Sequence, residues 1–595
     1  MRLRSEIPAE TTWDLTHLYR NESGFDKDLE NIRALLSDIS GKKGQLTATA
    51  AGLLQVLQWH DQLGVLLEHT AGYAHMAFDV DMGDPAAKER YETMNNLLDK
   101  LSDQLSFVEP EFLRMEPETF DAYAAREPQL ETYRFTFEKL FRQKAHVRAE
   151  SEEEILSRMG SLGGVFGKIY DDLVVNDLPF PEIPGEDGQM ILANEANYRK
   201  ILGGYNRDLR ERYFSALLNA YGSHVNAITS ILAGSVKSRV FAARTRFYPS
   251  SRHMALARNH IPIEVYDNLI ATVRAQTGPL RDYLALRRET LGYDALHFYD
   301  LFVPLVEDSD KSYTYEEARD TVLEALQVLG EPYVQVLREA FAQRWIDVYP
   351  NKGKTPGAYA SGIYGVHPYS LLNFAGTLDD VFTMAHELGH VMHSYYSNIH
   401  QPYVKSDYAI FAAEVASTVN ENLLYHYLLK KAQTPREKTH LLSMHLDAFR
   451  STMYRQAFFA DFEMTAHHMA ETDIPLTPQS LCERYGDLYA LYYGPGFAID
   501  ECLRYEWARI PHFYNSFYVY QYATGISAAI TLAKGVLTGK SGALDAYLAF
   551  LRSGGSDYPI ALLQKAGVDM SSPGPILAAV DDFKETLAAL KATRA

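Results

Sequence analysis

The sequence has only two cysteines among its 595 residues, Cys482 and Cys502. Two thiols exclude the multiple-disulfide framework that small secreted domains use in place of a large core. Neither cysteine lies in a motif with metal-ligand spacing, so we expect both to be small buried side chains.

Long apolar runs are also absent. No uninterrupted stretch of about 18 apolar residues occurs, which excludes a membrane-spanning helix. The opening residues, MRLRSEIP, lack the apolar centre of a signal peptide. We therefore expect a cytoplasmic protein for which the membrane is no partner.

Positive charge is in deficit, since 57 Lys and Arg residues face 77 Asp and Glu residues and leave a net charge of −20. A chain of this sign is repelled by phosphate backbones, which disfavours nucleic acid as a partner, and we expect none. With 47% hydrophobic residues the chain can build a large core, and its length indicates at least two lobes.

Neither an internal repeat of solenoid length nor a low-complexity tail occurs. Apolar residues recur at helical spacing, which predicts a mainly α fold. We expect helices over 129–144 and 151–159, a turn or strand pair over 176–185, and a long helical run from Leu209 to Ala243.

Against these absences stands one motif, His386-Glu387-Leu388-Gly389-His390. Thr377 is a suitable N-cap, an acidic residue follows three positions later, and no proline interrupts 378–397, so the motif lies in a predicted helix. Two imidazoles four residues apart project from one helical face and can bind one Zn²⁺, with Glu387 positioned as the general base. The alternative is a helix with two ordinary histidines and a solvated glutamate, but apolar neighbours indicate burial.

A third protein ligand has three candidates. His393 lies about 10 Å along the helix axis from His386, too far to share the ion. The metzincin pattern fails because its glycine and third histidine would fall at His393 and Tyr396. A second helix, expected from about Ser406, supplies the remaining candidate.

Glu414 in that second helix has apolar or small neighbours, and a buried acid needs a compensating charge such as zinc. The small residues around it would allow close approach to the first helix. Glu421, seven residues later on the same face, suits a hydrogen bond to a ligand histidine. For both glutamates the alternative is a helix-surface acid.

A di-iron carboxylate site would need two Glu-x-x-His pairs. Glu387-x-x-His390 matches the pattern, but the other nearby match, Glu437-x-x-His440, lies in a polar helix start that we expect to be solvated. Mononuclear zinc is the better interpretation.

The motif and the glutamate that follows it resemble the oligoendopeptidase F branch of the thimet oligopeptidase-like zinc peptidases. The resemblance extends over most of the chain. Its supporting segments are Thr12–Leu15, Arg344–Lys354, Phe411–Ser417 and Trp507–Tyr514.

This resemblance implies an enzyme that hydrolyses internal bonds of short peptides, with one Zn²⁺ per chain held by His386, His390 and Glu414, and with Glu387 as the catalytic base. It also implies a mainly helical, two-lobed body around a deep substrate channel, with a small β-sheet beside the zinc helix. We place an N-terminal helical lobe at residues 1–200 and the catalytic domain at 201–595.

Two segments are candidates for substrate contact. Gly357, Ala358 and Tyr359 open a glycine-rich segment before a predicted strand at 369–374, and a sheet edge there could pair with an extended peptide; an ordinary hairpin linker is the alternative. The resemblance places a substrate-contacting histidine and tyrosines in a later stretch. We assign oxyanion stabilisation to His512 and substrate contact to Tyr514, Tyr518 and Tyr520, with an aromatic core cluster as the alternative.

Two rival classes stay open at this point. A zinc exopeptidase shares the motif chemistry but needs a group that holds a free terminus. A catalytically silent peptide-binding protein is the other rival, and the intact Glu387 argues against it.

Overall fold

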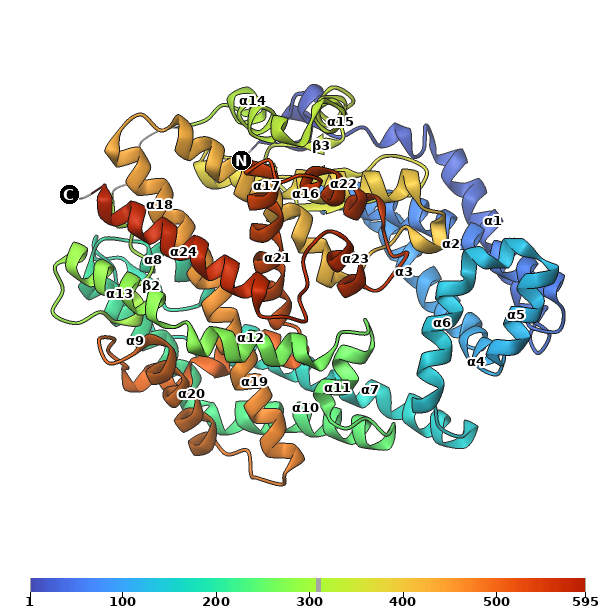
Figure 1. Ribbon diagram of the computed structural model, residues 1–595, viewed down its shortest axis with the longest axis horizontal. Coiled ribbons are helices and arrows are strands. Elements are labelled where there is room, and N and C mark those ends of the chain that lie inside the picture. The colour runs from blue at the N-terminus through green and yellow to red at the C-terminus, as the bar shows by residue number, and fades with distance from the viewer. Residues whose placement is uncertain (1, 307–311, 594–595) are drawn as a thin grey trace. The chain divides into compact units, whose positions relative to one another are not determined.

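The computed structural model describes residues 2–306 and 312–593 (Figure 1). The chain forms two compact units, each assembled from three separate stretches. The first unit comprises Met1–Ala145, Lys311–Tyr427 and Leu532–Val568, and the second comprises His146–Asp310, Leu428–Thr531 and Asp569–Ala595. The expected mainly helical fold is confirmed. The boundary near residue 200 and the substrate channel stay predictions.

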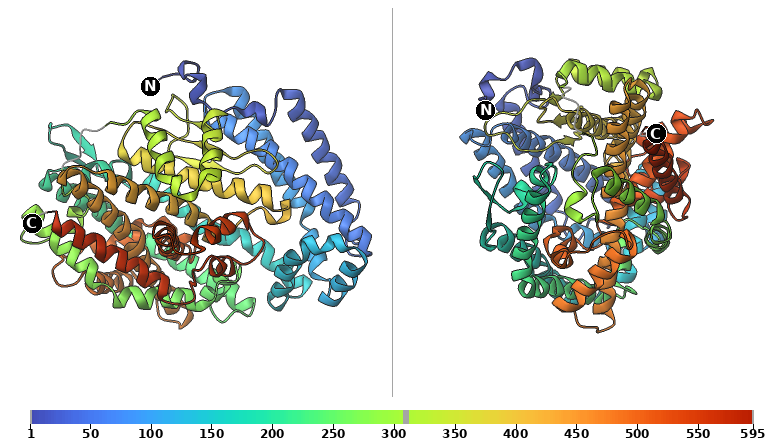
Figure 2. Two further views of the ribbon diagram at one scale, coloured as in Figure 1. Left: turned by 45° about the horizontal axis from the view of Figure 1, so that its top comes forward. Right: turned by 90° about the vertical axis from the view of Figure 1, so that its left-hand side faces the viewer.

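The first unit begins with helices that pack side by side, as Figure 2 shows in blue for α1 to α3. Their buried faces form a continuous apolar core that includes Ile32, Leu53 and Phe137. The helices of this unit are α1 (Glu22–Ser40), α2 (Ala50–Asp79), α3 (Pro85–Leu105), α4 (Val108–Leu113), α5 (Pro117–Arg126), α6 (Arg134–Gln143), α14 (Tyr315–Leu326), α15 (Glu331–Ala342), α16 (Leu378–His400), α17 (Ile410–Lys431), α22 (Ala543–Arg552) and α23 (Pro559–Lys565).

A three-stranded sheet lies against α16 in the same unit. Its strands are β3 (Ile346–Asp347), β4 (Tyr359–Ser361) and β5 (Tyr369–Leu371), in the order β3-β5-β4. β5 is parallel to β3 and antiparallel to β4, with Ala360 opposite Ser370. The predicted small sheet beside the motif helix is therefore confirmed, and the predicted strand at 369–374 ends at Leu371.

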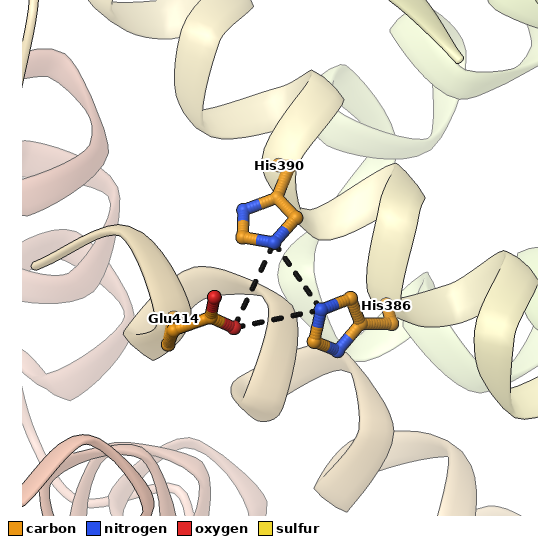
Figure 3. A group of neighbouring side chains, drawn as sticks. All are labelled: His386, His390 and Glu414. Atoms are coloured by element: carbon orange, nitrogen blue, oxygen red, sulfur yellow. Dashed lines mark hydrogen bonds and ion pairs between the residues drawn. The ribbon is translucent and has the colours of Figure 1, made fainter. Parts of the chain in front are cut away.

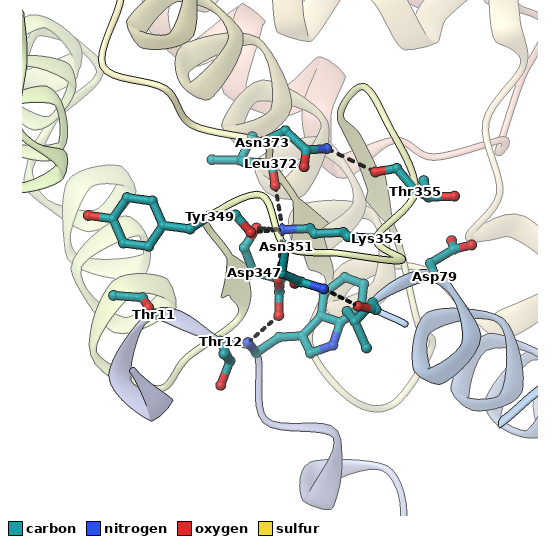
Figure 4. A network of polar contacts seen from close by, with 12 residues as sticks. Thr11, Thr12, Asp79, Asp347, Tyr349, Asn351, Lys354, Thr355, Leu372 and Asn373 are labelled. Carbon is teal, nitrogen blue, oxygen red and sulfur yellow. Dashed lines mark hydrogen bonds and ion pairs between the residues drawn. The ribbon is translucent and has the colours of Figure 1, made fainter. Parts of the chain in front are cut away.

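A buried ion pair holds the loop between β3 and β4 (Figure 4). The Nζ of Lys354 donates to Oδ1 of Asp347 at 2.7 Å and to the carbonyl oxygen of Tyr349 at 2.9 Å, and both charged side chains are inaccessible to solvent. Arg4 donates to the same Oδ1 at 2.9 Å. The ammonium thus has several acceptors, which offset the cost of burying it.

The N-terminal segment is tied to this sheet through Trp13. Its ring is buried with Met76 of α2, Ile363, and Tyr369 and Leu371 of β5. The segment therefore acts as packing for the sheet, because its indole covers β5 on the side of α2.

The second unit is helical with one two-stranded hairpin, β1 (Glu182–Pro184) and β2 (Met190–Leu192). The turn or strand pair expected over 176–185 contains the first strand alone, because the hairpin extends to Leu192. Its helices are α7 (Glu150–Asp172), α8 (Tyr198–Leu202), α9 (Arg207–Ser223), α10 (Val225–Thr245), α11 (Ser251–Ala257), α12 (Ile263–Ala275), α13 (Gly278–Leu291), α18 (Pro435–Phe449), α19 (Arg455–Glu471), α20 (Pro478–Tyr493), α21 (Tyr520–Leu537) and α24 (Gly574–Ala592).

The long helical run predicted from Leu209 to Ala243 is formed by two helices, because α9 ends at Ser223 and α10 begins at Val225. The break lies at His224, where the hydroxyl of Ser223 bonds both the carbonyl of Ala220 and Nδ1 of His224. Such local side-chain bonds compete with the helical ladder.

Cys482 is partly exposed and Cys502 is buried, and both are free thiols. The burial expected for both cysteines is therefore confirmed for Cys502 and not for Cys482. Over residues 2–306 and 312–593, no helix has the length and apolar character that crossing a membrane requires.

Candidate metal centre

The motif helix α16 begins with a capping box. Thr377 Oγ1 accepts a hydrogen bond from the backbone N–H of Asp380 at 3.2 Å, and the Asp380 carboxylate accepts one from the backbone N–H of Thr377 at 2.8 Å. The N-cap predicted from the sequence is therefore confirmed, and the helix runs without interruption to His400.

Helix α17 approaches α16 at the glycine inside the motif. A Cβ placed on Gly389 would lie 2.5 Å from Cα of Ser417 and 2.8 Å from the carbonyl oxygen of Ala416. Asn420 of α17 also donates to the carbonyl oxygen of Ala385 at 3.1 Å. The expected close approach through small residues is thus confirmed, and it places Glu414 beside the motif histidines.

Three donor atoms converge between these helices (Figure 3). Nε2 of His386 lies 3.2 Å from Nε2 of His390 and 3.5 Å from Oε2 of Glu414, and the third side of the triangle is 3.8 Å. Donors bound at about 2.0–2.1 Å to a tetrahedral ion lie about 3.3 Å apart. The triangle therefore has the dimensions of a zinc site, and these are the two imidazoles and the carboxylate chosen from the sequence.

Glu421 lies behind the first histidine. Its Oε1 makes a short hydrogen bond with Nδ1 of His386, which leaves Nε2 directed toward His390 and Glu414. Burial acts to lower the pKa of His386, but the bond to Glu421 and the charges of Glu387 and Glu414 together raise that pKa to about 9. The acidic surroundings therefore favour a positive charge at this imidazole position.

Glu387 stands between the two motif histidines in the sequence. The residue is buried, with 7% of its surface exposed. Burial raises the pKa of its carboxyl group to about 7, although the neighbouring His386 opposes the shift. Its Oε2 has no hydrogen-bond partner among the described residues. A buried carboxylate oxygen without a partner is costly to keep, and it is what a general base that must take a proton near neutral pH requires.

The other metal arrangements weighed from the sequence are not formed in the described parts of the chain. His393 stacks on Tyr408 with ring centroids 3.6 Å apart and is absent from the donor cluster. Glu437 caps α18, where its carboxylate accepts from the backbone N–H of Thr434. Neither Glu437 nor His440 belongs to a donor cluster among the described residues, so a di-iron site is excluded there.

Helix α17 begins at Ile410 and not near Ser406 as expected. The reason lies in Tyr408, whose hydroxyl bonds Ser394 of α16 at 2.8 Å while its ring covers His393. These contacts hold the chain before Ile410 outside the helix.

The glycine-rich segment precedes and includes the edge strand β4. Gly357 has φ +87°, and its carbonyl oxygen accepts from Nδ2 of Asn373 at 2.7 Å. The Tyr359 hydroxyl donates to Asp79 of α2 at 2.7 Å, so this ring is directed toward α2. Only β5 pairs with β4 among the described strands, which leaves the backbone groups of the other edge of β4 for another partner.

The aromatic stretch, the segment 512–522 that contains His512, Tyr514, Tyr518 and Tyr520, lies in the second unit. The rings of His512, Tyr518 and Tyr522 are near one another, with centroids 5.4–6.3 Å apart. Tyr514 packs on Tyr170 at 4.4 Å, and Tyr520 is buried. The structure therefore groups His512 with Tyr518, and substrate contact for all four predicted residues stays a prediction.

The sequence interpretation missed Tyr522, Gly389 and Asn420. Tyr522 lies four residues after Tyr518, but Tyr518 precedes helix α21, which begins at Tyr520, so helical spacing does not predict their contact. The roles of Gly389 and Asn420 depend on the position of a second helix, and spacing within one helix carries no such information.

Comparison with known proteins agrees with this geometry. Residues 204–582 match the model of peptidase family M3, and residues 111–180 match that of oligopeptidase F. Oligopeptidase PepF of Bacillus subtilis is 40% identical over 584 residues, which cover 98% of this chain and 87% of that protein. Group B oligopeptidase PepB of Streptococcus agalactiae is 36% identical over 99% of this chain and 98% of its own length.

Among solved structures, oligoendopeptidase-F from Enterococcus faecium is similar with a TM-score of 0.75 and 33% identity, covering 96% of this chain and 99% of that one. The fold and the donor set define a metallopeptidase. The chain belongs to peptidase family M3, in its oligopeptidase F branch.

Proposed function

We propose that this peptidase binds one Zn²⁺ through His386, His390 and Glu414 and hydrolyses internal bonds of short peptides. The observation that carries the proposal is the triangle of donor atoms, 3.2–3.8 Å on a side, beside a buried Glu387 with an unpartnered oxygen. Nitrogen and carboxylate donors of this number leave one position open, as in catalytic zinc sites.

When bound, Zn²⁺ supplies a Lewis acid that polarises the scissile carbonyl group and water. Glu387 takes a proton from the attacking water and later delivers it to the leaving amine. The pKa of about 7 that burial gives its carboxyl group suits both transfers near neutral pH. Glu421 holds His386 in the tautomer that leaves Nε2 for the metal.

We assign stabilisation of the oxyanion to His512, with Tyr518 as a further hydrogen-bond donor. Peptide hydrolysis passes through a tetrahedral intermediate whose oxygen carries negative charge, and prepositioned N–H and O–H donors stabilise that charge. The grouping of the two rings supports this assignment. Tyr514 and Tyr520 are assigned to substrate contact on the family resemblance alone.

Substrate binding is assigned to the open edge of β4, which begins at Tyr359, and to Gly357 and Ala358 before it. An extended peptide that adds to a sheet edge is bound through its backbone, which demands few particular side chains. This mode suits an enzyme for diverse short peptides, and the names of the relatives as oligopeptidases support that substrate class. Location in the cytoplasm and the absence of nucleic-acid or membrane partners stay predictions.

A peptide blocked at both ends, with a fluorophore and a quencher, tests the proposal. We expect internal cleavage, loss of cleavage when a chelator removes the metal, and recovery when Zn²⁺ is added back. An exopeptidase would leave this peptide intact because neither terminus is free, and a silent binding protein would cleave nothing. Either result would overturn the proposed function.

A further inference from the structure

Helix α19 of the second unit carries a buried carboxyl group, Glu463, with 3% of its surface exposed. Its Oε1 accepts a hydrogen bond from the backbone N–H of Phe517 at 2.6 Å. Its Oε2 has no partner among the described residues. A buried carboxyl group with one hydrogen bond is costly, so its presence in the core beside Phe517 indicates a specific task there.

Phe517 is one of few non-glycine residues in the described chain with a positive φ, here +59°. A bulky side chain in this left-handed region costs roughly 1–2 kcal/mol and persists only where surrounding contacts impose it. Its buried ring packs against Tyr266 at 5.8 Å and His467 at 4.5 Å between ring centroids. The ring contacts and the hydrogen bond that the backbone N–H of Phe517 donates to Glu463 together hold this conformation.

The constrained residue lies inside the aromatic stretch. It directly precedes Tyr518 and follows His512 by five residues, and those two rings have centroids 6.3 Å apart with planes inclined by 19°. The dihedral angles of Phe517 fix the direction in which the chain leaves toward Tyr518. A change from left-handed to extended backbone there would separate the two rings.

We propose that Glu463 is a positioning residue of this peptidase, which holds Phe517 in its left-handed conformation and so sets the arrangement of His512 and Tyr518. The inference rests on the proposed function, in which those two side chains stabilise the oxyanion. Glu463 itself touches neither substrate nor metal in this account.

Glu463 acts on Phe517 as a hydrogen-bond acceptor and not through a negative charge. Burial raises the pKa of Glu463 to about 8, against a smaller opposing effect of the hydrogen bond from Phe517. The side chain is therefore mostly neutral at pH 7, and it acts through a carbonyl-type acceptor. A glutamine offers the same acceptor in the same shape, whereas leucine offers none.

The test compares Glu463→Gln and Glu463→Leu in the full chain, with the blocked peptide as substrate and zinc content as a second readout. We expect glutamine to keep kcat within about threefold of the parent enzyme, because its amide oxygen accepts from Phe517. We expect leucine to lower kcat about 10- to 100-fold with KM and zinc content nearly unchanged, since misplaced catalytic groups cost rates of this order.

Asp461→Asn is the matched control on the same helix. Its buried carboxylate accepts from Nε of Arg274 at 2.6 Å and from the hydroxyl of Tyr492 at 3.0 Å and so ties α19 to α12 and α20, and both partners lie outside the aromatic stretch. We expect it to lower the melting temperature without the loss of kcat. If Glu463→Leu does not fold, Glu463→Asp replaces it, because the carboxyl group is kept but is one methylene too short to reach Phe517 in place.

A double-mutant cycle with His512→Ala completes the test. If Glu463 acts by positioning His512, adding Glu463→Leu to the His512→Ala enzyme lowers kcat by less than about threefold. A Glu463→Leu enzyme with parental kcat, beside an impaired His512→Ala enzyme, would overturn the inference and leave the proposed function intact. A His512→Ala enzyme with parental kcat would instead contradict the oxyanion assignment, and with it the route assigned to Glu463.

Discussion

Gly389 and Ser417 are in backbone contact, because a Cβ on the glycine would lie 2.5 Å from Cα of the serine. This contact sets the separation of the two helices that carry the metal donors. Gly389→Ala must push α17 away, and overpacking of this kind costs about 1–3 kcal/mol. We expect weaker zinc binding by tenfold or more in a chelator competition, because Glu414 recedes from His386 and His390.

Gly160→Ala is the control for that change, since nothing lies within 4 Å of a Cβ at this position in α7. A helical glycine replaced by alanine without a clash gains up to about 1 kcal/mol. Parental zinc affinity in Gly389→Ala would show that the contact does not set the site.

Glu421→Gln tests the carboxylate behind His386. The amide keeps the size of the side chain but not the charge that makes the Nδ1 bond strong. We expect zinc affinity to fall about 10- to 100-fold, the usual effect of removing such a partner. Glu30→Gln on the exposed face of α1 serves as the control. Equal zinc affinities in the two variants would show that Glu421 does not contribute to metal binding.

The pH dependence of stability tests the environment of Glu68 on α2, which accepts from the backbone N–H of Tyr364 at 2.8 Å. Burial raises the folded-state pKa of Glu68 from 4.5 to about 7, and the bond from Tyr364 only partly opposes it. The neutral carboxyl group therefore contributes stability that is full below pH 4.5 and is lost as the pH rises through 7.

Glu68→Gln cannot ionise, so its stability relative to the parent enzyme should rise by about 1–3 kcal/mol between pH 4.5 and pH 7.5. Thermal unfolding of both proteins across this range measures the difference. A difference that does not change with pH would mean that Glu68 ionises normally in the folded enzyme.

The buried pair of Lys354 and Asp347 predicts a large loss of stability in Lys354→Met. Removal of Lys354 leaves Arg4 as the remaining cationic partner of Asp347 and takes the ammonium donor from the buried carbonyl oxygens of Tyr349 and Leu372, which costs about 1–3 kcal/mol. Lys352→Met, two residues away on the exposed side of the loop, should change stability by less than about 0.5 kcal/mol. Similar melting temperatures for the two variants would contradict the role assigned to the network in Figure 4.

The metal donors were predictable because their signal is local. Two imidazoles on one helix face, a capping box at Thr377 and an acid in apolar surroundings at Glu414 each follow from spacing within a single helix. The small sheet beside α16 was also anticipated, since its strands lie shortly before the motif.

The remaining features depend on contacts between distant segments. The helix break at His224 and the late start of α17 follow from particular side-chain bonds that apolar periodicity does not encode. The bond between Glu463 and Phe517 joins residues 54 positions apart. The same holds for the two units, each of which collects three stretches of chain.

The most direct measurement of the central claim compares Glu387→Gln with Glu414→Ala for zinc content and for turnover of the blocked peptide. We predict that Glu387→Gln keeps one zinc per chain and loses at least about 10²-fold in kcat, because the base is gone and the ligands are not. Glu414→Ala should lose zinc as well as activity. Full turnover in Glu387→Gln, or an unchanged zinc content in Glu414→Ala, would contradict the account.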